Sequence, residues 1–196
     1  MIGAISLMRQ RGDISQDAFQ KHWLAVHGPL VLAMPGLRRY QQAHITAALS
    51  IPAEIMAVDG FAQLFFASVE ARAIAYASPE LAACDRDSPL FIGAVTRCIT
   101  EITDLGPGRT PHKLMVLLPI GEPLGANELA ALPGRAGGQF HRVTSQGAAP
   151  NSVVATFICP LRALAELWFT DESALRAAAV ICKNAAVYAV REHEFI

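Results

Sequence analysis

Residues 61–76 read FAQLFFASVEARAIAY, and residues 164–179 read LAELWFTDESALRAAA. Each stretch begins as an apolar strand that ends in a phenylalanine, continues through a polar residue, and becomes a helix rich in alanine. Ser68 and Asp171 are placed as helix N-caps, whose side chains accept hydrogen bonds from the free N–H groups of the first turn. The two stretches predict an internal repeat.

The rest of each half follows the same order. Short apolar strands are predicted at 2–8 and 112–118, and similar closing strands at 96–105 and 188–196. Each half then reads strand, helix, strand, strand, helix, strand, which is the order of a ferredoxin-like unit.

The fold class that we predict is α+β, built from tandem ferredoxin-like (βαββαβ) repeats. The first repeat spans 1–105, the second spans 112–196, and the Gly- and Pro-rich stretch 106–111 links them. Both helices of such a unit cover one sheet face, so the other apolar face must be buried elsewhere. Two units that face each other bury it as a pseudo-twofold α/β barrel around a central cavity.

Composition excludes several classes of protein. The chain has 196 residues, of which 53% are hydrophobic, and this fraction excludes intrinsic disorder. Sixteen Lys and Arg against seventeen Asp and Glu leave no basic excess for binding nucleic acid. The four cysteines have no metal or redox spacing, and neither a membrane span nor a signal peptide is visible, so we expect a cytoplasmic protein.

The first predicted helix begins after Asp13 or Ser15 and carries one apolar stripe that includes Trp23. His27 lies beside this stripe. Pro29 follows at once and has no N–H to donate, so the helix should kink or restart there.

The stretch FQKHWLAVHGPLVLAMPGLRRY (19–40) resembles the opening signature of the EthD-like family. The matching positions are Phe19, His22, Trp23, His27, Pro29, Leu30, Pro35, Gly36 and Tyr40. The signature helix occurs in the first half, whereas its counterpart GANELAALPG (125–134) is shorter and has neither His nor Trp. The sequence therefore looks like a tandem duplication with a degenerate second copy.

The resemblance implies a dimeric α/β-barrel fold, built here within one chain or completed by a second chain in a homodimer. The family is similar to small cofactor-independent enzymes that act on lactones, polyketides and aromatic breakdown products, such as muconolactone isomerases. Fold alone does not decide function.

His27 and Tyr40 are the predicted catalytic residues. The pKa of histidine lies near neutrality, which suits a general acid or base; alternatively, His27 bonds a backbone carbonyl beside Pro29. The Tyr40 hydroxyl would hold a developing oxyanion, or else it bonds the nearest backbone while its ring packs. Tyr40 shares one strand face with Arg38, Gln42 and His44.

Gln63 and Glu166 are equivalent positions in the two copies and alternate with apolar neighbours, so both are predicted to point into the barrel. Glu166 would be an acid or base with a raised pKa, or an ion-pair partner of an arginine such as Arg142 or Arg191.

The predicted function is binding of a small apolar carbonyl, lactone or aromatic compound and proton transfer on it, as in an isomerase, cyclase or lyase, without cofactor or metal. Trp23, Phe65 and Trp168 would supply apolar walls, and Gln63 and Glu166 polar contacts. The alternatives are a non-catalytic binding or accessory protein of a catabolic or biosynthetic pathway, and a monooxygenase-like barrel.

Overall fold

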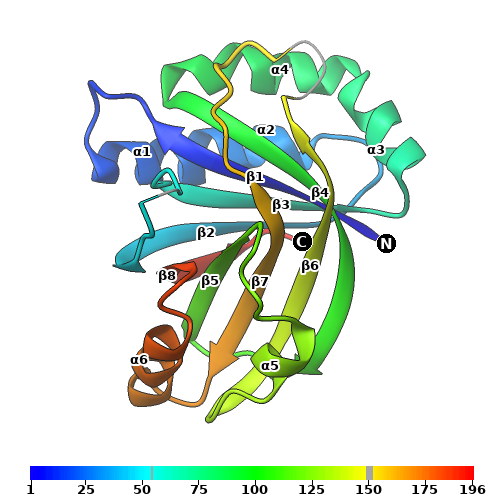
Figure 1. Ribbon diagram of the computed structural model, residues 1–196. Coiled ribbons are helices and arrows are strands. Elements are labelled where there is room, and N and C mark those ends of the chain that lie inside the picture. Colours follow the sequence, from blue (N-terminus) through cyan, green and yellow to red (C-terminus); the bar gives the residue numbers. More distant parts are fainter. Residues whose placement is uncertain (54, 149–151) are drawn as a thin grey trace.

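The computed structural model describes residues 1–53, 55–148 and 152–196. Within them, eight strands close into a barrel in the order β1-β3-β2-β8-β5-β7-β6-β4, with the helices on its outside (Figure 1). The strands are β1 (Ile2–Gln10), β2 (Leu37–Ser50), β3 (Gly60–Phe66), β4 (Ile92–Pro107), β5 (His112–Pro119), β6 (Arg135–Gly147), β7 (Leu161–Phe169) and β8 (Ala186–Glu194). The helices are α1 (Gln16–His22), the π-helix η1 (Trp23–His27), α2 (Gly28–Leu32), α3 (Val69–Tyr76), α4 (Pro79–Asp87), the 3-10 helix η2 (Ser88–Leu90), α5 (Ala126–Ala130) and α6 (Glu172–Ile181).

The mixed α/β class and the closed antiparallel barrel are confirmed. The strands of the first half lie in the order β4-β1-β3-β2, and those of the second half in the equivalent order β8-β5-β7-β6. The second strand of each half pairs with the last strand of the other half, and these two pairings close the barrel within one chain. Strand β4 continues to Pro107, inside the stretch that the sequence suggested as a linker.

Three clusters of buried apolar side chains follow from the alternation along the strands. One lies between the first-half sheet and α1, α2 and α4, and a second lies between the second-half sheet, α5 and α6. The third fills part of the barrel interior with side chains from both halves, such as Ile5, Phe61, Met115 and Tyr188.

The predicted helix caps are confirmed. The backbone N–H of Ala71 donates to the Ser68 hydroxyl at 3.2 Å, and that of Ala174 donates to the Asp171 carboxylate at 2.9 Å. At the end of the first helical segment, Gly36 adopts φ +72°, a conformation that glycine enters without steric cost, and the chain turns into β2.

The predicted break of the helix at Pro29 is also confirmed, and it takes the form of a π-helical stretch between two α-helices. Helix α1 ends at His22, one π-helical stretch carries Trp23 to His27, and α2 restarts at Gly28 with proline in its first turn. Because a π-turn bonds residues five apart, the N–H of Gly28 donates to the carbonyl of Trp23.

Candidate active site

The π-helix brings two histidines to one carboxylate. Residues five apart in a regular α-helix lie about 140° apart around the axis, whereas one π-turn places them on the same side. His22 Nε2 lies 2.9 Å from Asp87 Oδ1, and His27 Nδ1 lies 2.8 Å from Asp87 Oδ2. The Phe91 ring packs against both imidazoles. Asp87, at the end of α4, thus joins α4 to the first helical segment.

Burial and the contact with Asp87 together determine the protonation state of His27. The side chains of His27 and Asp87 are each 9% exposed. Burial lowers the pKa of His27, and the hydrogen bond and charge of Asp87 oppose that shift without cancelling it. The ring is therefore neutral at pH 7. Because its Nδ1–H donates to the carboxylate, the lone pair lies on Nε2, as a general base requires.

His27 and Tyr40 line the same cavity, which lies between the helices and the outer face of the first-half sheet and measures about 50 Å³. Much of its lining is apolar, including Met8, Val31 and Leu64, and the charged residues Asp85 and Arg97 also line it. The structure therefore brings the two predicted catalytic residues together. The predicted alternative for His27, a bond to a backbone carbonyl, is replaced by the bond to Asp87.

The Tyr40 side chain is held by one contact at its ring and another at its hydroxyl. Its ring stacks on Phe195 with centroids 4.8 Å apart, and its hydroxyl accepts a hydrogen bond from Gln42 at 2.8 Å. A Cβ atom at Gly28 would lie 2.5 Å from the Phe195 ring, so glycine here leaves room for that stack. Burial raises the pKa of Tyr40 well above its usual value, and the phenol stays protonated and able to donate.

Trp23 lies deeper in the same helix layer. Its ring is fully buried and stacks on His44, with centroids 4.6 Å apart and planes within 5°. Its carbonyl accepts a hydrogen bond from Gln42. Trp23 therefore supports the Tyr40 strand from the side of the helices, and the described residues that line the cavity do not include it.

The other four predicted residues, Gln63, Phe65, Glu166 and Trp168, lie on the opposite face of the sheet, inside the barrel. Glu166 is fully buried and receives hydrogen bonds from Lys113 at 2.6 Å and from His141 at 2.9 Å. The interpretation that it pairs with Arg142 or Arg191 is wrong, because Arg142 pairs with Glu101 on the outside of the barrel.

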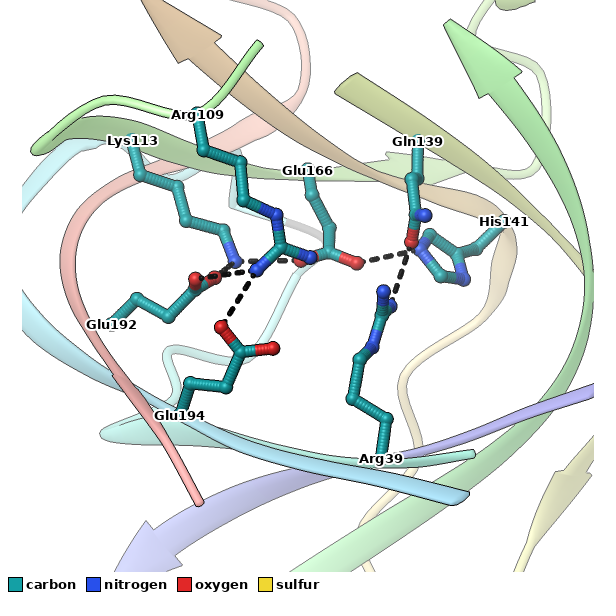
Figure 2. A network of polar contacts seen from close by, with 8 residues as sticks. All are labelled: Arg39, Arg109, Lys113, Gln139, His141, Glu166, Glu192 and Glu194. Atoms are coloured by element: carbon teal, nitrogen blue, oxygen red, sulfur yellow. Dashed lines mark hydrogen bonds and ion pairs between the residues drawn. The ribbon is translucent and has the colours of Figure 1, made fainter. Parts of the chain in front are cut away.

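Glu166 is also not an acid with a raised pKa. Burial alone would raise its pKa, but the charge of Lys113 and the contact with His141 outweigh burial and hold the pKa well below its usual range. Figure 2 shows the surrounding network. Lys113 also contacts Glu192, and Arg109 spans Glu192 at 3.3 Å and Glu194 at 3.1 Å.

Sequence reasoning missed Asp87 and Lys113. No local pattern marks Asp87, since its partners are 60 and 65 residues away. Lys113 did carry a signal: it opens the apolar strand HKLMVLL, and a lysine that alternates into an apolar interior needs a carboxylate.

The EthD domain family matches residues 11–94 of this chain. Residues 11–94 are an EthD domain. The match contains His27, Tyr40 and Asp87, so the whole histidine–carboxylate contact lies inside the EthD domain. No curated protein matches the chain.

Two of three similar solved structures extend over both halves of the chain. An anthrone oxidase-like protein is 13% identical, with a TM-score of 0.59, over 98% of this chain and 92% of its own. A proposed monooxygenase from Lactobacillus acidophilus is 8% identical, with a TM-score of 0.52, over 97% of this chain and 93% of its own. An EthD family protein from Bacillus halodurans is 26% identical, with a TM-score of 0.43, over 52% of this chain and 97% of its own. At their low identities, the first two likenesses show that the EthD domain and the second half together share a known barrel fold.

Metal-binding clusters and membrane-spanning helices were sought in both halves of the chain. In the described ranges, no group of three or more His, Cys, Asp or Glu side chains is placed to hold a metal ion. Over those same residues, no helix combines the length and the apolar character needed to cross a membrane.

Proposed function

We propose that the protein binds a small, largely apolar carbonyl, lactone or aromatic compound in the His27–Tyr40 cavity and transfers a proton on it. The observation that carries the proposal is that His27, which contacts Asp87 through Nδ1, lines the same cavity as Tyr40. No cofactor takes part in the proposed reaction.

The chemistry follows from these two groups. His27 Nε2 takes a proton from the carbon next to the substrate carbonyl, and the electron pair of that C–H bond moves toward the carbonyl oxygen. Tyr40 donates a hydrogen bond to the oxyanion that develops, and Asp87 stabilises the imidazolium. Return of the proton to another carbon gives isomerisation, and loss of a leaving group from the neighbouring carbon gives elimination.

The cavity must widen to admit such a substrate. A cavity of about 50 Å³ holds one or two water molecules, far less than a lactone or a phenol requires. Tyr76 and Leu81 line it and are partly exposed, from α3 and α4. We propose that these side chains move aside as the ligand enters.

We also propose that the chain arose by duplication, with repeats at 1–105 and 112–196 joined at 106–111. The equivalent strand orders and the paired caps at Ser68 and Asp171 support this origin. Because the barrel closes within one chain, the proposed site needs no residue from a second copy, and a homodimer would form through the outer surface.

Deuterium exchange tests the proposal. The protein is incubated in D₂O with γ-butyrolactone or acetophenone, and loss of the proton next to the carbonyl is followed by NMR. His27→Gln should lower the exchange rate by about 100-fold or more, since general-base catalysis contributes on that scale. The matched control is His112→Gln, at a half-exposed histidine of the other half, and should exchange as the parent does.

The principal alternative is a non-catalytic binding or accessory protein, in which His27 contacts a bound ligand without transferring a proton. It predicts saturable NMR shifts of His27 on addition of either compound, with exchange no faster than in His27→Gln. A monooxygenase-like reaction remains a further alternative, and it predicts consumption of oxygen with a phenolic substrate.

A further inference from the structure

One end of the barrel interior contains buried polar atoms that have no hydrogen-bond partner in the described part of the chain. They are the amide oxygen and nitrogen of both Gln41 and Gln63, and Nε of Arg39. Both glutamines are 0% exposed and lie directly opposite each other on β2 and β3. Next to this pair, Arg39 lies over the Phe65 ring, 3.7 Å from its centroid.

These atoms contrast with the facing wall. On the strands of the second half, Lys113 and His141 both bond Glu166, and Thr100 on β4 adds a contact to His141 Nδ1 at 3.2 Å. Buried polar groups are nearly always paired in proteins, and a group left unpaired points to a ligand, an ion or an ordered water. Among the described residues of the barrel interior, the unpaired atoms lie on two adjacent strands, β2 and β3, whereas the other unpaired atoms, on Gln10, Trp23, Arg72 and Ser78, are scattered outside it.

We propose that this end of the barrel is a second ligand site, which takes a small hydroxylated carboxylate held by Arg39, Gln41 and Gln63. The unpaired atoms comprise three donors and two acceptors. A carboxylate accepts from Arg39 Nε and the two amide N–H groups, and a hydroxyl on the ligand donates to an amide oxygen.

The charge of Arg39 supports an anion. Its guanidinium contacts the Gln139 amide oxygen at 2.9 Å, and none of the ion pairs of the described residues includes it. Burial lowers the pKa of Arg39, and the carboxylates of Glu166, Glu194 and Glu192 act in the opposite direction from a distance. In contrast, Lys113 and Arg109 pair directly with the three carboxylates of the network drawn in Figure 2.

A ligand would enter this site past the ion pairs of Arg109. The Arg109 side chain is 35% exposed and that of Glu194 is 47% exposed, so their contact is solvated and easily separated. The site is on the opposite sheet face from the His27–Tyr40 cavity and does not depend on the function proposed for that cavity.

Glycolate is the probe, because it is the smallest ligand with both a carboxylate and a hydroxyl. We expect ¹³C-labelled glycolate to bind saturably with a Kd of about 1 mM or tighter, and to raise the melting temperature. Ethylene glycol, which lacks the charge, should do neither. His27→Gln should leave the glycolate affinity unchanged, which separates this site from the proposed active site.

The decisive variant is Gln63→Met, which keeps the length of the side chain and removes its polar atoms. It should weaken glycolate binding at least tenfold without lowering the melting temperature, because the amide it removes has no partner among the described residues. Absence of saturable glycolate binding by the parent, or equal binding by Gln63→Met, overturns the proposal. A crystal structure with glycolate that shows only water at Gln41 and Gln63 overturns it as well.

Discussion

Each half of the chain buries one carboxylate between two basic side chains, but on opposite faces of the sheet. In the first half, Asp87 lies between His22 and His27 in the helix layer. In the second half, Glu166 lies between Lys113 and His141 inside the barrel. The first cluster borders a cavity, and Nε2 of His27 remains for a ligand. In the second cluster, the positive charge of Lys113 pairs with the Glu166 carboxylate. The comparison supports the proposal that the first cluster takes part in chemistry, and it suggests a structural role for the second.

The largest effect is expected from Lys113→Met, which leaves Glu166 buried without its cationic partner. Breaking such a pair costs about 3–5 kcal/mol of the free energy of unfolding, measured by urea denaturation. Lys21→Met is the matched control, because its ion pair with Asp17 is exposed on both sides and contributes less than about 1 kcal/mol. A loss of under about 1 kcal/mol in Lys113→Met would mean that the second cluster is not structural.

Asp87→Asn tests the first cluster. The amide cannot stabilise an imidazolium, so the proton-exchange rate should fall about 10–100-fold, the usual effect of removing a group that orients a functional histidine. The pKa of His27 should fall further, since Asp87 raises it, and the acid limb of the pH–rate profile should move to lower pH. Asp17→Asn, on the exposed side of α1, is the control. An unchanged acid limb would contradict the positioning role of Asp87.

His44 makes stability depend on pH in the helix layer. Burial, together with His193 and Arg191, lowers the pKa of His44 to about 4. As the pH falls, His44 in the unfolded chain therefore binds a proton before His44 in the folded chain does. The full contribution of neutral His44 to the free energy of unfolding is present above about pH 6.5, and it decreases as the pH drops toward the folded pKa. At pH 5 the loss from this group is about 2 kcal/mol. His44→Gln should flatten the dependence between pH 7.5 and 5, and an equal slope in both proteins would rule out this group as its source.

The smallest effects are expected at the equivalent helix caps. Ser68→Ala and Asp171→Ala each remove a side chain that accepts from the first turn, and each should cost about 1 kcal/mol of stability. Thermal unfolding of the two variants measures whether the halves respond alike. A large loss from one variant alone would show that the two halves do not fold as equivalent units.

Local patterns predicted much of the fold because they report short-range physics. Alternation along 61–66 and 164–169 placed Gln63 and Glu166 inside, and cap chemistry placed the helices that follow. The same alternation grouped Tyr40 with Gln42 and His44, which do share the helix-facing side. It could not say which side faced the helices, because both sides of β2 carry polar residues.

The sequence by itself therefore determined the elements, their order and the residues that share each strand face, since these depend on neighbours a few positions away. Tertiary structure alone decided the partners: Asp87 for His27, and Lys113 in place of an arginine for Glu166. It also divided the predicted site into a helix-side cavity and a barrel interior. The physical reason is that ion pairs and cavities are made by packing between elements far apart in the chain, here up to 65 residues for the first cluster.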